Sequence, residues 1–339
     1  RGLTHHHTPR PPLNAPAPLR FVQIIRSLEK LPPSIRGGAV AIGNFDGVHR
    51  GHARLVGRLV ERARQVGGPA IVFTFDPHPV RLLRPEQCPP PLTWTERKAE
   101  LLARLGVDFV VAYPTDRELL SLSARAFFDL IVVARLAARA MVEGPNFYFG
   151  KGREGNIELL AQFAGDAGLA LEIAEPAEID AQMISSSRIR RLLSETGDAA
   201  AAAAMLTAPY RLRGIVTHGA GRGAGIGFPT ANLEGIDTLM PAHGGYAGAA
   251  WADDKAWPAA INVGPNPTFG ESATKLEAHL MGCDRSLYGA PLELDFLRRL
   301  RDVRSFASAD DLAEQVARDT EAALGIGSDH LQSATHDTP

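Results

Sequence analysis

Two histidines, His49 and His52, stand three residues apart directly after an apolar run, in the stretch AVAIGNFDGVHRGH. If a helix begins at about Val48 or His49, both side chains lie in its first turn, where free backbone N–H groups and the helix dipole favour anions. Gly43 and Gly47 would let the backbone approach a ligand closely. Imidazole donors in such a place suit a polyphosphate on which charge develops during a reaction. The alternative is a pair of ordinary core histidines, but the spacing and the glycines favour phosphate chemistry.

A second candidate site lies in the run GIVTHGAGRGAGIGFPTANL, at 214–233. Its alternating glycines do not match the dinucleotide-binding fingerprint, because Pro229 prevents a helix from starting where that fingerprint needs one. The chain has no Walker A sequence either. Thr230 and Asn232 are two residues apart, so on an extended segment their side chains point to the same side. Their oxygens could share a hard cation such as Mg²⁺ with a nucleotide phosphate.

A carboxylate with a possible catalytic role, Glu277, lies in the run LEAHLMG at 276–282. The apolar residues Leu276 and Ala278 alternate with the polar residues Glu277 and His279, which predicts a strand with the polar pair on one face. A carboxylate that faces a substrate hydroxyl is the simplest base for phosphoryl transfer. The alternative is a strand residue that only faces solvent.

The elements that must position the histidines alternate between strands and helices from about residue 20 to 205. This alternation predicts an α/β domain, a parallel sheet with helices on its faces. Ligands of such sheets lie at the carboxyl ends of the strands, and GNFDGVHRGH lies at one such end. We expect strands at 38–45, 69–75, 108–114 and 139–145, and helices at 52–66, 95–106, 123–136 and 186–207.

The composition changes after Pro209, where glycines become dense and short apolar-alternating runs follow one another. These runs lie at 211–219, 244–252, 257–264, 274–282 and 292–301. Short strands separated by Gly and Pro turns predict a small antiparallel β-barrel, and 309–325 predicts a helix after it. We therefore expect one domain over 20–205 and another over 206–325, with a disordered leader at 1–19 and a disordered tail at 326–339.

The bulk composition limits the possible functions. The chain of 339 residues is long enough for two domains, and no apolar run approaches the ~20 residues of a membrane span. The formal net charge of −2 gives no general reason to expect nucleic acid or a membrane surface as a partner, so any phosphate recognition must be local. Cys88 and Cys283 suggest neither a disulfide framework nor a metal site, and no signal peptide is evident, which predicts a cytoplasmic protein.

Four stretches of the N-terminal half resemble, in order, the adenylyltransferase module of the bacterial bifunctional riboflavin kinase/FAD synthetases. They are GNFDGVHRGH, with the H-x-G-H signature of nucleotidylyltransferases, FTFDPHP at 73–79, GPNFYFGKGREG at 144–155 and ISSSRIR at 184–190. The resemblance implies that His49 and His52 contact the phosphates of ATP and that Asp46 shapes their loop, beside Gly43 and Gly47. In this family the N-terminal module is a Rossmann-like nucleotidylyltransferase domain.

The same resemblance assigns ISSSRIR to the place where pyrophosphate leaves. Ser186 and Ser187 would offer hydroxyl groups there, and Arg190 a planar array of donors for phosphate oxygens. The serines could instead cap a helix. Both roles can hold together, because a helix N-terminus is also an anion site.

The flavin contacts that the resemblance suggests are His78, Asn146 and Phe149. A structural turn is the alternative for His78, which lies between two prolines. The family usually has Asp where this chain has Asn146 and Thr where it has Ser187. These departures bear on the rate more than on the reaction.

The C-terminal half resembles the riboflavin kinase module over about 205–325. In that module a GFPTAN element holds Mg²⁺ and ATP beneath a glycine-rich flap, which assigns the metal to Thr230 and Asn232. The residues assigned to the nucleotide are Gly219, Arg222 and Gly227. INVGPNPTFG, LEAHLMG and LYGAPLELDFLRRLRDVRSF are similar to further elements of the module, and the resemblance makes Glu277 the base that accepts the proton of the ribityl 5′-hydroxyl of riboflavin. Ala224 stands where the family often has another basic residue.

Together the two resemblances predict a two-domain enzyme. It would phosphorylate riboflavin to FMN in the barrel and transfer an adenylyl group from ATP to FMN in the N-terminal domain, giving FAD and pyrophosphate. ATP is then a co-substrate, Mg²⁺ a cofactor, and FMN and FAD are substrate and products rather than prosthetic groups. The alternatives are a riboflavin kinase with a degraded N-terminal domain and a flavin-binding regulator without turnover. The sequence leaves the oligomeric state open.

Overall fold

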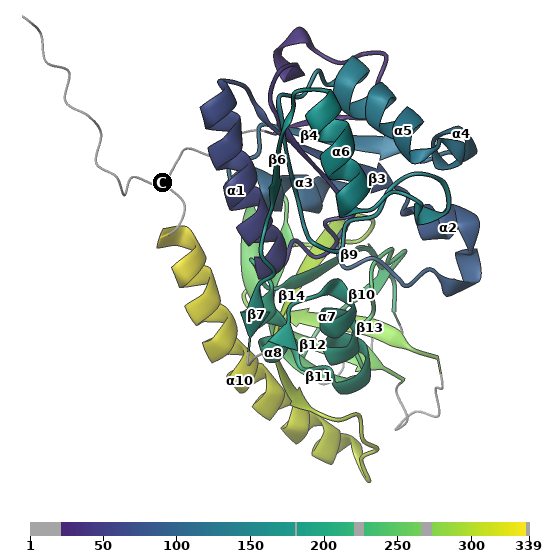
Figure 1. Ribbon diagram of the computed structural model, residues 1–339. Coiled ribbons are helices and arrows are strands. Elements are labelled where there is room, and N and C mark those ends of the chain that lie inside the picture. The colour runs from purple at the N-terminus through teal and green to yellow at the C-terminus, as the bar shows by residue number, and fades with distance from the viewer. Residues whose placement is uncertain (1–21, 180–181, 220–226, 266–272, 337–339) are drawn as a thin grey trace, which may run out of the picture.

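The computed structural model describes residues 22–179, 182–219, 227–265 and 273–336, which form two domains (Figure 1). The N-terminal domain contains a sheet of six parallel strands in the order β1-β4-β3-β2-β5-β6. The strands are β1 Gln23–Ile25, β2 Ala39–Ile42, β3 Ala70–Asp76, β4 Phe109–Pro114, β5 Ala140–Glu143 and β6 Ala170–Ile173. The predicted parallel α/β domain is confirmed.

The central strands are continuous apolar runs because helices cover both faces of the sheet. Every residue of β2 is buried, and so are the first five residues of β3. These central strands, with β4 and β5, are the four that the sequence predicts. The sequence does not predict the edge strands β1 and β6, because neither is a fully buried run, and β6 has no buried residue at all.

The four helices that the sequence predicts for this domain are present, together with α2, α4 and α6, which it does not predict. The helices are α1 Arg50–Val66, α2 Pro79–Leu83, α3 Thr95–Arg104, α4 Arg117–Ser121, α5 Ala124–Phe127, α6 Ile157–Asp166, α7 Ser186–Arg191 and α8 Ala199–Met205. Both α5 and α7 continue as π-helical segments, over Phe128–Arg135 and Leu192–Thr196. The last predicted helix is divided in two because Gly197, at a φ of 66°, adopts a left-handed conformation that ends the first part.

The C-terminal domain is a closed barrel of six antiparallel strands in the order β10-β13-β12-β11-β14-β9. The strands are β9 Tyr210–Thr217, β10 Ala231–Glu234, β11 Gly244–Ala252, β12 Lys255–Gly264, β13 Lys275–Leu280 and β14 Pro291–Arg301. In β13, Leu276 and Ala278 are buried in the barrel core, whereas Glu277 and His279 on the other face are half-buried. The predicted barrel and the predicted alternation are both confirmed.

A long helix, α10 Ala309–His336, ends the described chain and packs along β11 and β12 (Figure 1). The prediction of a disordered tail is therefore wrong for 326–336. The helix continues because Gly327 lies against the sheet, where a Cβ would come within 2.7 Å of the carbonyl oxygen of Gly248, and because His330 contacts the buried Asp295 at 3.3 Å. The leader at 1–19 and residues 337–339 lie outside the described residues. Within the described ranges, α10 and the other helices are all too short or too polar to cross a membrane.

The barrel contacts the N-terminal domain close to the loop that carries the histidines. Thr207 Oγ1, just before the barrel, donates to the carbonyl of Val48 at 2.6 Å. The backbone N–H of Leu239 donates to the carbonyl of Pro91 at 2.9 Å. Part of the ligand-binding edge of the parallel sheet is therefore covered by the second domain.

Candidate active sites

The two histidines line a cavity of about 280 Å³ at the carboxyl end of β2, which we call the histidine cavity. His49 is the N-cap of α1 and His52 lies in its first turn. Gly43 also lines the cavity, and Gly47, at a φ of 82°, forms the turn before His49 with a backbone conformation that favours glycine. The helix terminus that the sequence predicts as an anion site therefore opens into a cavity.

His49 and His52 cap the helix reciprocally. The backbone N–H of His52 donates to Nδ1 of His49, and the backbone N–H of His49 donates to Nδ1 of His52, each at 3.3 Å. The rings stack with their centroids 3.6 Å apart. Because each Nδ1 accepts a hydrogen bond, the neutral rings carry their protons on Nε2. The pair is thus fixed as two parallel imidazoles whose Nε2–H groups are the remaining donors.

Burial keeps both imidazoles neutral. Desolvation lowers the pKa of His49 to about 4, although the field of Asp46 acts in the opposite direction. Desolvation also places the pKa of His52 well below its usual value, and repulsion from His49 and from the ammonium of Lys98 adds to this effect. At neutral pH the cavity therefore presents neutral N–H donors rather than imidazolium charges.

A buried carboxyl group, that of Glu143 at the end of β5, lines the same cavity. Its side chain accepts the backbone N–H of Ile42 at 2.8 Å. Burial raises the pKa of Glu143 well above its usual value, which favours the protonated carboxyl group, and that form can donate as well as accept a hydrogen bond.

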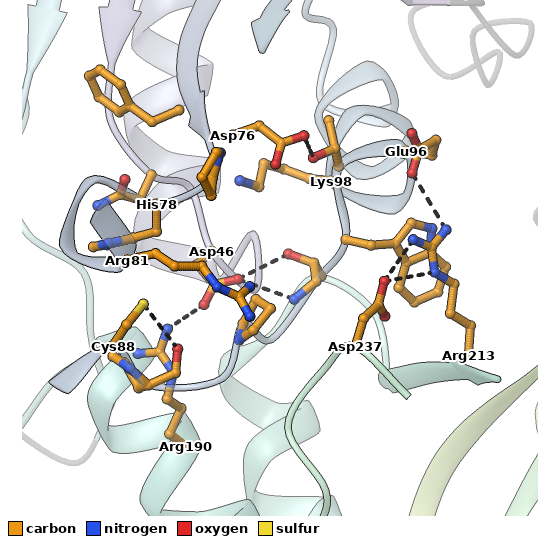
Figure 2. A pocket seen from close by; sticks show the side chains of 18 residues that line it. Asp46, Asp76, His78, Arg81, Cys88, Glu96, Lys98, Arg190, Arg213 and Asp237 are labelled. Atoms are coloured by element: carbon orange, nitrogen blue, oxygen red, sulfur yellow. Dashed lines mark hydrogen bonds and ion pairs between the residues drawn. The ribbon is translucent and has the colours of Figure 1, made fainter. Parts of the chain in front are cut away.

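A second cavity, of about 260 Å³, lies between the carboxyl end of β3 and the barrel, and we call it the interdomain cavity (Figure 2). The charged and titratable groups that line it include Asp46, Asp76, His78, Lys98 and Arg190 of the N-terminal domain and Arg213 and Asp237 of the barrel. Asn44 lines both cavities. Its side-chain oxygen is buried and finds no hydrogen-bond partner in the described part of the chain. The two cavities therefore meet at Asn44.

Asp46 fixes the loop between the cavities, as expected of a loop-shaping residue. Its carboxylate accepts the backbone N–H groups of Leu92 at 2.9 Å and of Thr93 at 3.1 Å, and it forms an ion pair with Arg190. Its carbonyl oxygen accepts the hydroxyl of Ser186 at 2.8 Å. The histidine loop is thereby tied to segment 91–93 and to α7.

The ISSSRIR element is placed differently from the expectation. Arg190 lines the interdomain cavity, but its guanidinium is bound to Asp46 (Figure 2). Ser185 is the residue that caps α7, Ser186 is hydrogen-bonded to the histidine loop, and Ser187 is exposed and does not line either cavity. Of the three expected phosphate contacts, only Arg190 faces one of these cavities.

The three residues suggested for the flavin do not come together. His78 lines the interdomain cavity, and its Nδ1 accepts the backbone N–H of Val80 at 3.1 Å, so it is also a turn residue. Asn146 lines the histidine cavity instead. Phe149 is 6% exposed, and its ring stacks on that of Phe147 within the hydrophobic core. The structure therefore places Phe149 in the core and at neither cavity.

In the barrel, the expected base and metal ligand are neighbours on adjacent strands. The register pairs Asn232 of β10 with Glu277 of β13, and Glu277 with Asn262 of β12. Thr217 of β9 is paired with Asn232 on its other side. Residues paired across antiparallel strands have their side chains on the same face. These four polar residues therefore form one group on the outer face of the barrel, which we call the barrel cluster.

The barrel cluster offers oxygen donors that suit a hard cation. The hydroxyl oxygen of Thr217 is buried and has no hydrogen-bond partner among the residues described. Thr230 is held beside the cluster because Nδ1 of His279 lies 2.8 Å from the carbonyl oxygen of the preceding Pro229. Mg²⁺ usually takes one or two protein oxygens and completes its coordination with phosphate and water. The donor set therefore fits Mg²⁺ bound together with a nucleotide.

Of the expected flap residues, Gly219 lies against this cluster. A Cβ at Gly219 would come within 2.1 Å of Nδ2 of Asn232, so the backbone passes this close only because residue 219 has no side chain. Gly227 has a φ of 87°, in the region that favours glycine. Arg222 lies outside the described residues.

The sequence alone does not identify three residues that line the cavities, namely Asn44, Lys98 and Glu143. Lys98 is three and four residues before the buried Leu101 and Leu102, on the apolar face of α3. A lysine within a buried stripe is a signal that could have pointed to it. Glu143 ends a strand whose other residues are apolar, which is a similar but weaker signal.

Comparisons with known proteins agree with this arrangement. The family models for FAD synthetase and riboflavin kinase match residues 31–188 and 206–326. The chain is 35% identical over 306 residues to a bifunctional riboflavin kinase/FMN adenylyltransferase of Pseudomonas fluorescens, covering 90% of this chain and 98% of the relative. It is 33% identical over 292 residues to a bifunctional riboflavin kinase/FMN adenylyltransferase of Bacillus subtilis, covering 84% of this chain and 91% of the relative. A crystal structure described as a macrolide-efflux protein from Streptococcus pneumoniae matches this chain with a TM-score of 0.78 and 28% sequence identity. The match covers 89% of this chain and 98% of the other, which supports the fold of both domains. The chain belongs to the bifunctional riboflavin kinase/FMN adenylyltransferase family and contains both of its catalytic domains.

Proposed function

We propose that the N-terminal domain joins ATP to FMN where its two cavities meet. ATP occupies the histidine cavity, since the donors there lie at a helix N-terminus, and FMN occupies the interdomain cavity, where Lys98 and Arg190 supply positive charge. Asn44 lines both cavities, so the α-phosphate of ATP and the phosphate of FMN approach each other at this residue. This shared wall is the observation that carries the proposal.

The reaction is an in-line displacement at phosphorus. An oxygen of the FMN phosphate forms a bond to the α-phosphorus of ATP, the bond from that phosphorus to the bridging oxygen of the β-phosphate breaks, and pyrophosphate leaves. His49 and His52 donate their Nε2–H groups to phosphate oxygens as charge develops, and donors fixed in advance in this way lower the barrier. The attacking phosphate oxygen carries no proton that must be removed, so the neutral histidines act only as hydrogen-bond donors.

The barrel carries out the first reaction. Glu277 accepts the proton of the ribityl 5′-hydroxyl of riboflavin while that oxygen attacks the γ-phosphorus of ATP, giving FMN and ADP. Thr230 and Asn232 are the residues that would hold Mg²⁺, which neutralises phosphate charge when bound. The cross-strand pairing of Glu277 with Asn232 supports this arrangement, because base and metal ligand lie side by side.

We place both reactions in the cytoplasm. Cys88 and Cys283 are free thiols, as is usual in a reducing compartment. ATP, riboflavin and FMN are the proposed partners, and the net charge of −2 gives nucleic acid no general attraction.

The main rival is a riboflavin kinase whose N-terminal domain has lost activity, as the departures at Ser187 and Asn146 suggest. The reciprocal histidine cap and the ion pair of Asp46 with Arg190 support two reactions instead. Purified protein incubated with FMN, ATP and Mg²⁺ distinguishes the two. FAD with an equal amount of pyrophosphate is the expected result. If FAD is absent while riboflavin is phosphorylated, the rival is correct, and if riboflavin binds tightly but stays unaltered, the protein is a flavin carrier.

Gly219→Ala is expected to reduce riboflavin phosphorylation roughly 10²-fold, because the added methyl group must displace the amide of Asn232. Formation of FAD from supplied FMN should not change. Gly325→Ala is the matched control, since a Cβ at this position of α10 meets nothing within 4 Å. Initial rates of both reactions on the same preparations measure the effect, and an unimpaired Gly219→Ala kinase would show that the amide position is unimportant.

A further inference from the structure

The ammonium group of Lys98 is buried in the wall of the interdomain cavity (Figure 2). The residue is 7% exposed. Within the described residues, the one hydrogen bond of Nζ is a long one, at 3.4 Å, to Oγ1 of Thr74. That hydroxyl in turn donates to the carbonyl oxygen of Asn44 at 3.2 Å. The positive charge therefore lies close to the residue at which the two cavities meet.

The nearby carboxylates are already bound by other groups. Asp46 is bound by Arg190 and by two backbone N–H groups, and Asp76 is bound by Arg26 at 3.0 Å. Neither carboxylate forms an ion pair with Lys98 in the part of the chain that the structure describes. A buried charge is costly unless it is paired. The fields of Asp46 and Asp76 offset the burial of Lys98 only in part, because desolvation still lowers the pKa of its ammonium. Lys98 thus has no directly paired anion among the described residues, and it faces a cavity.

The charge of Lys98 acts on both cavities. Repulsion from its ammonium contributes to the lowered pKa of His52, which lines the histidine cavity, and to that of His78, which lines the interdomain cavity. A cation that influences groups of both cavities is placed to interact with an anion from each.

We propose that Lys98 is a catalytic residue of adenylyl transfer, whose ammonium binds non-bridging oxygens of the two reacting phosphates. This inference rests on the proposed function of the N-terminal domain. Two phosphates repel each other as they approach, and a fixed cation between them reduces this repulsion most where the charges come closest, in the transition state. Lys98 transfers no proton. The FMN oxygen forms its bond to the α-phosphorus, the bond to the bridging oxygen breaks, and pyrophosphate leaves with that electron pair.

Lys98→Met tests the proposal, because Met has a similar length and no charge. We expect kcat for FAD formation from FMN to fall about 10²- to 10³-fold. Riboflavin phosphorylation should be unchanged, because the barrel cluster is a separate site. Removal of a buried charge that has no direct ion pair among the described residues relieves its desolvation, so Tm should stay the same or rise. Lys30→Met is the matched control, since Lys30 is an exposed lysine of the same domain and should affect neither reaction.

A second variant, Lys98→Gln, separates the loss of charge from a packing defect, and the same selective loss of FAD formation is expected. Unchanged kcat in Lys98→Met overturns the proposal. So does a parallel loss of both reactions with a lowered Tm, which is the result for a lysine with a purely structural role. Wild-type protein that forms no FAD refutes the proposed function and this role with it, whereas an active wild type with an unaffected Lys98→Met refutes the role alone.

Discussion

Glu277→Gln is expected to lower the rate of riboflavin phosphorylation about 10²- to 10⁴-fold, the usual contribution of a general base. Formation of FAD from supplied FMN should keep its wild-type rate. The amide preserves the size of the side chain but cannot take a proton from the ribityl hydroxyl. Because Glu277 lies between Asn232 and Asn262 in the strand register, its backbone pairing should survive the change. The measurement is the initial rate of each reaction, followed separately on one preparation.

Glu234→Gln is the matched control for Glu277→Gln. Glu234 is exposed on β10, two residues beyond Asn232, so the substitution removes the same charge close to the barrel cluster. Both reactions should be unaffected by it. A similar loss of phosphorylation in the two variants would show that net charge matters rather than position. Equal loss of both reactions in Glu277→Gln would contradict separate sites.

The sequence predicts those parts of the fold in which the apolar pattern of a segment reflects which of its own faces are buried. The strand β2 is an unbroken apolar run because both of its faces are covered, and β13 alternates because only one face is. The edge strand β1 has no such pattern and exists because it pairs with β4. The end of α10 depends on contacts of the same kind, between Gly327 and a distant strand. Polar sequence alone does not reveal such contacts.

In the candidate sites, too, the sequence predicts arrangements of residues that are close in the chain and not those that the fold brings together. The position of His49 and His52 at the start of one helix is predicted because it depends on residues within one helical turn, whereas their reciprocal cap is seen only in the structure. The adjacency of Asn232 and Glu277 is set by the register of β10 with β13, so the sequence suggests each residue but not their pairing. Phe149 shows the opposite case, since a motif suggests a ligand contact and the structure places the ring in the core.

The interdomain cavity is the part of the site that sequence patterns could not outline. Its walls come from the end of β3, from α3, from segment 88–91 and from the barrel. The buried stripe of α3 marks Lys98 as unusual, but the cavity that its ammonium faces is defined only when these segments are assembled. Residues that act at the junction of domains carry little local signal, because the partner of each is far away in the sequence.

Replacement of both histidines, His49→Ala with His52→Ala, is expected to give the opposite pattern to Glu277→Gln. FAD formation from FMN should fall by at least about 10³-fold, because both Nε2–H donors to the phosphates are lost. Riboflavin phosphorylation should continue. The double substitution also removes the reciprocal cap of α1, which costs about 1 kcal/mol for a typical N-cap. Loss of FAD formation in this variant alone would therefore not separate chemistry from stability.

His49→Asn separates these two effects. Asn is among the best N-cap residues, so its side-chain oxygen can accept the backbone N–H of His52 in place of Nδ1. Its shorter side chain places no donor where Nε2 of the imidazole lies. We expect a Tm close to that of the wild type together with a fall in FAD formation of about 10²-fold. Full FAD formation in His49→Asn would show that His49 is only a cap. Continued riboflavin phosphorylation shows for each variant that the chain is folded. Unchanged FAD formation in the double Ala variant would exclude the histidine cavity as the site of adenylyl transfer.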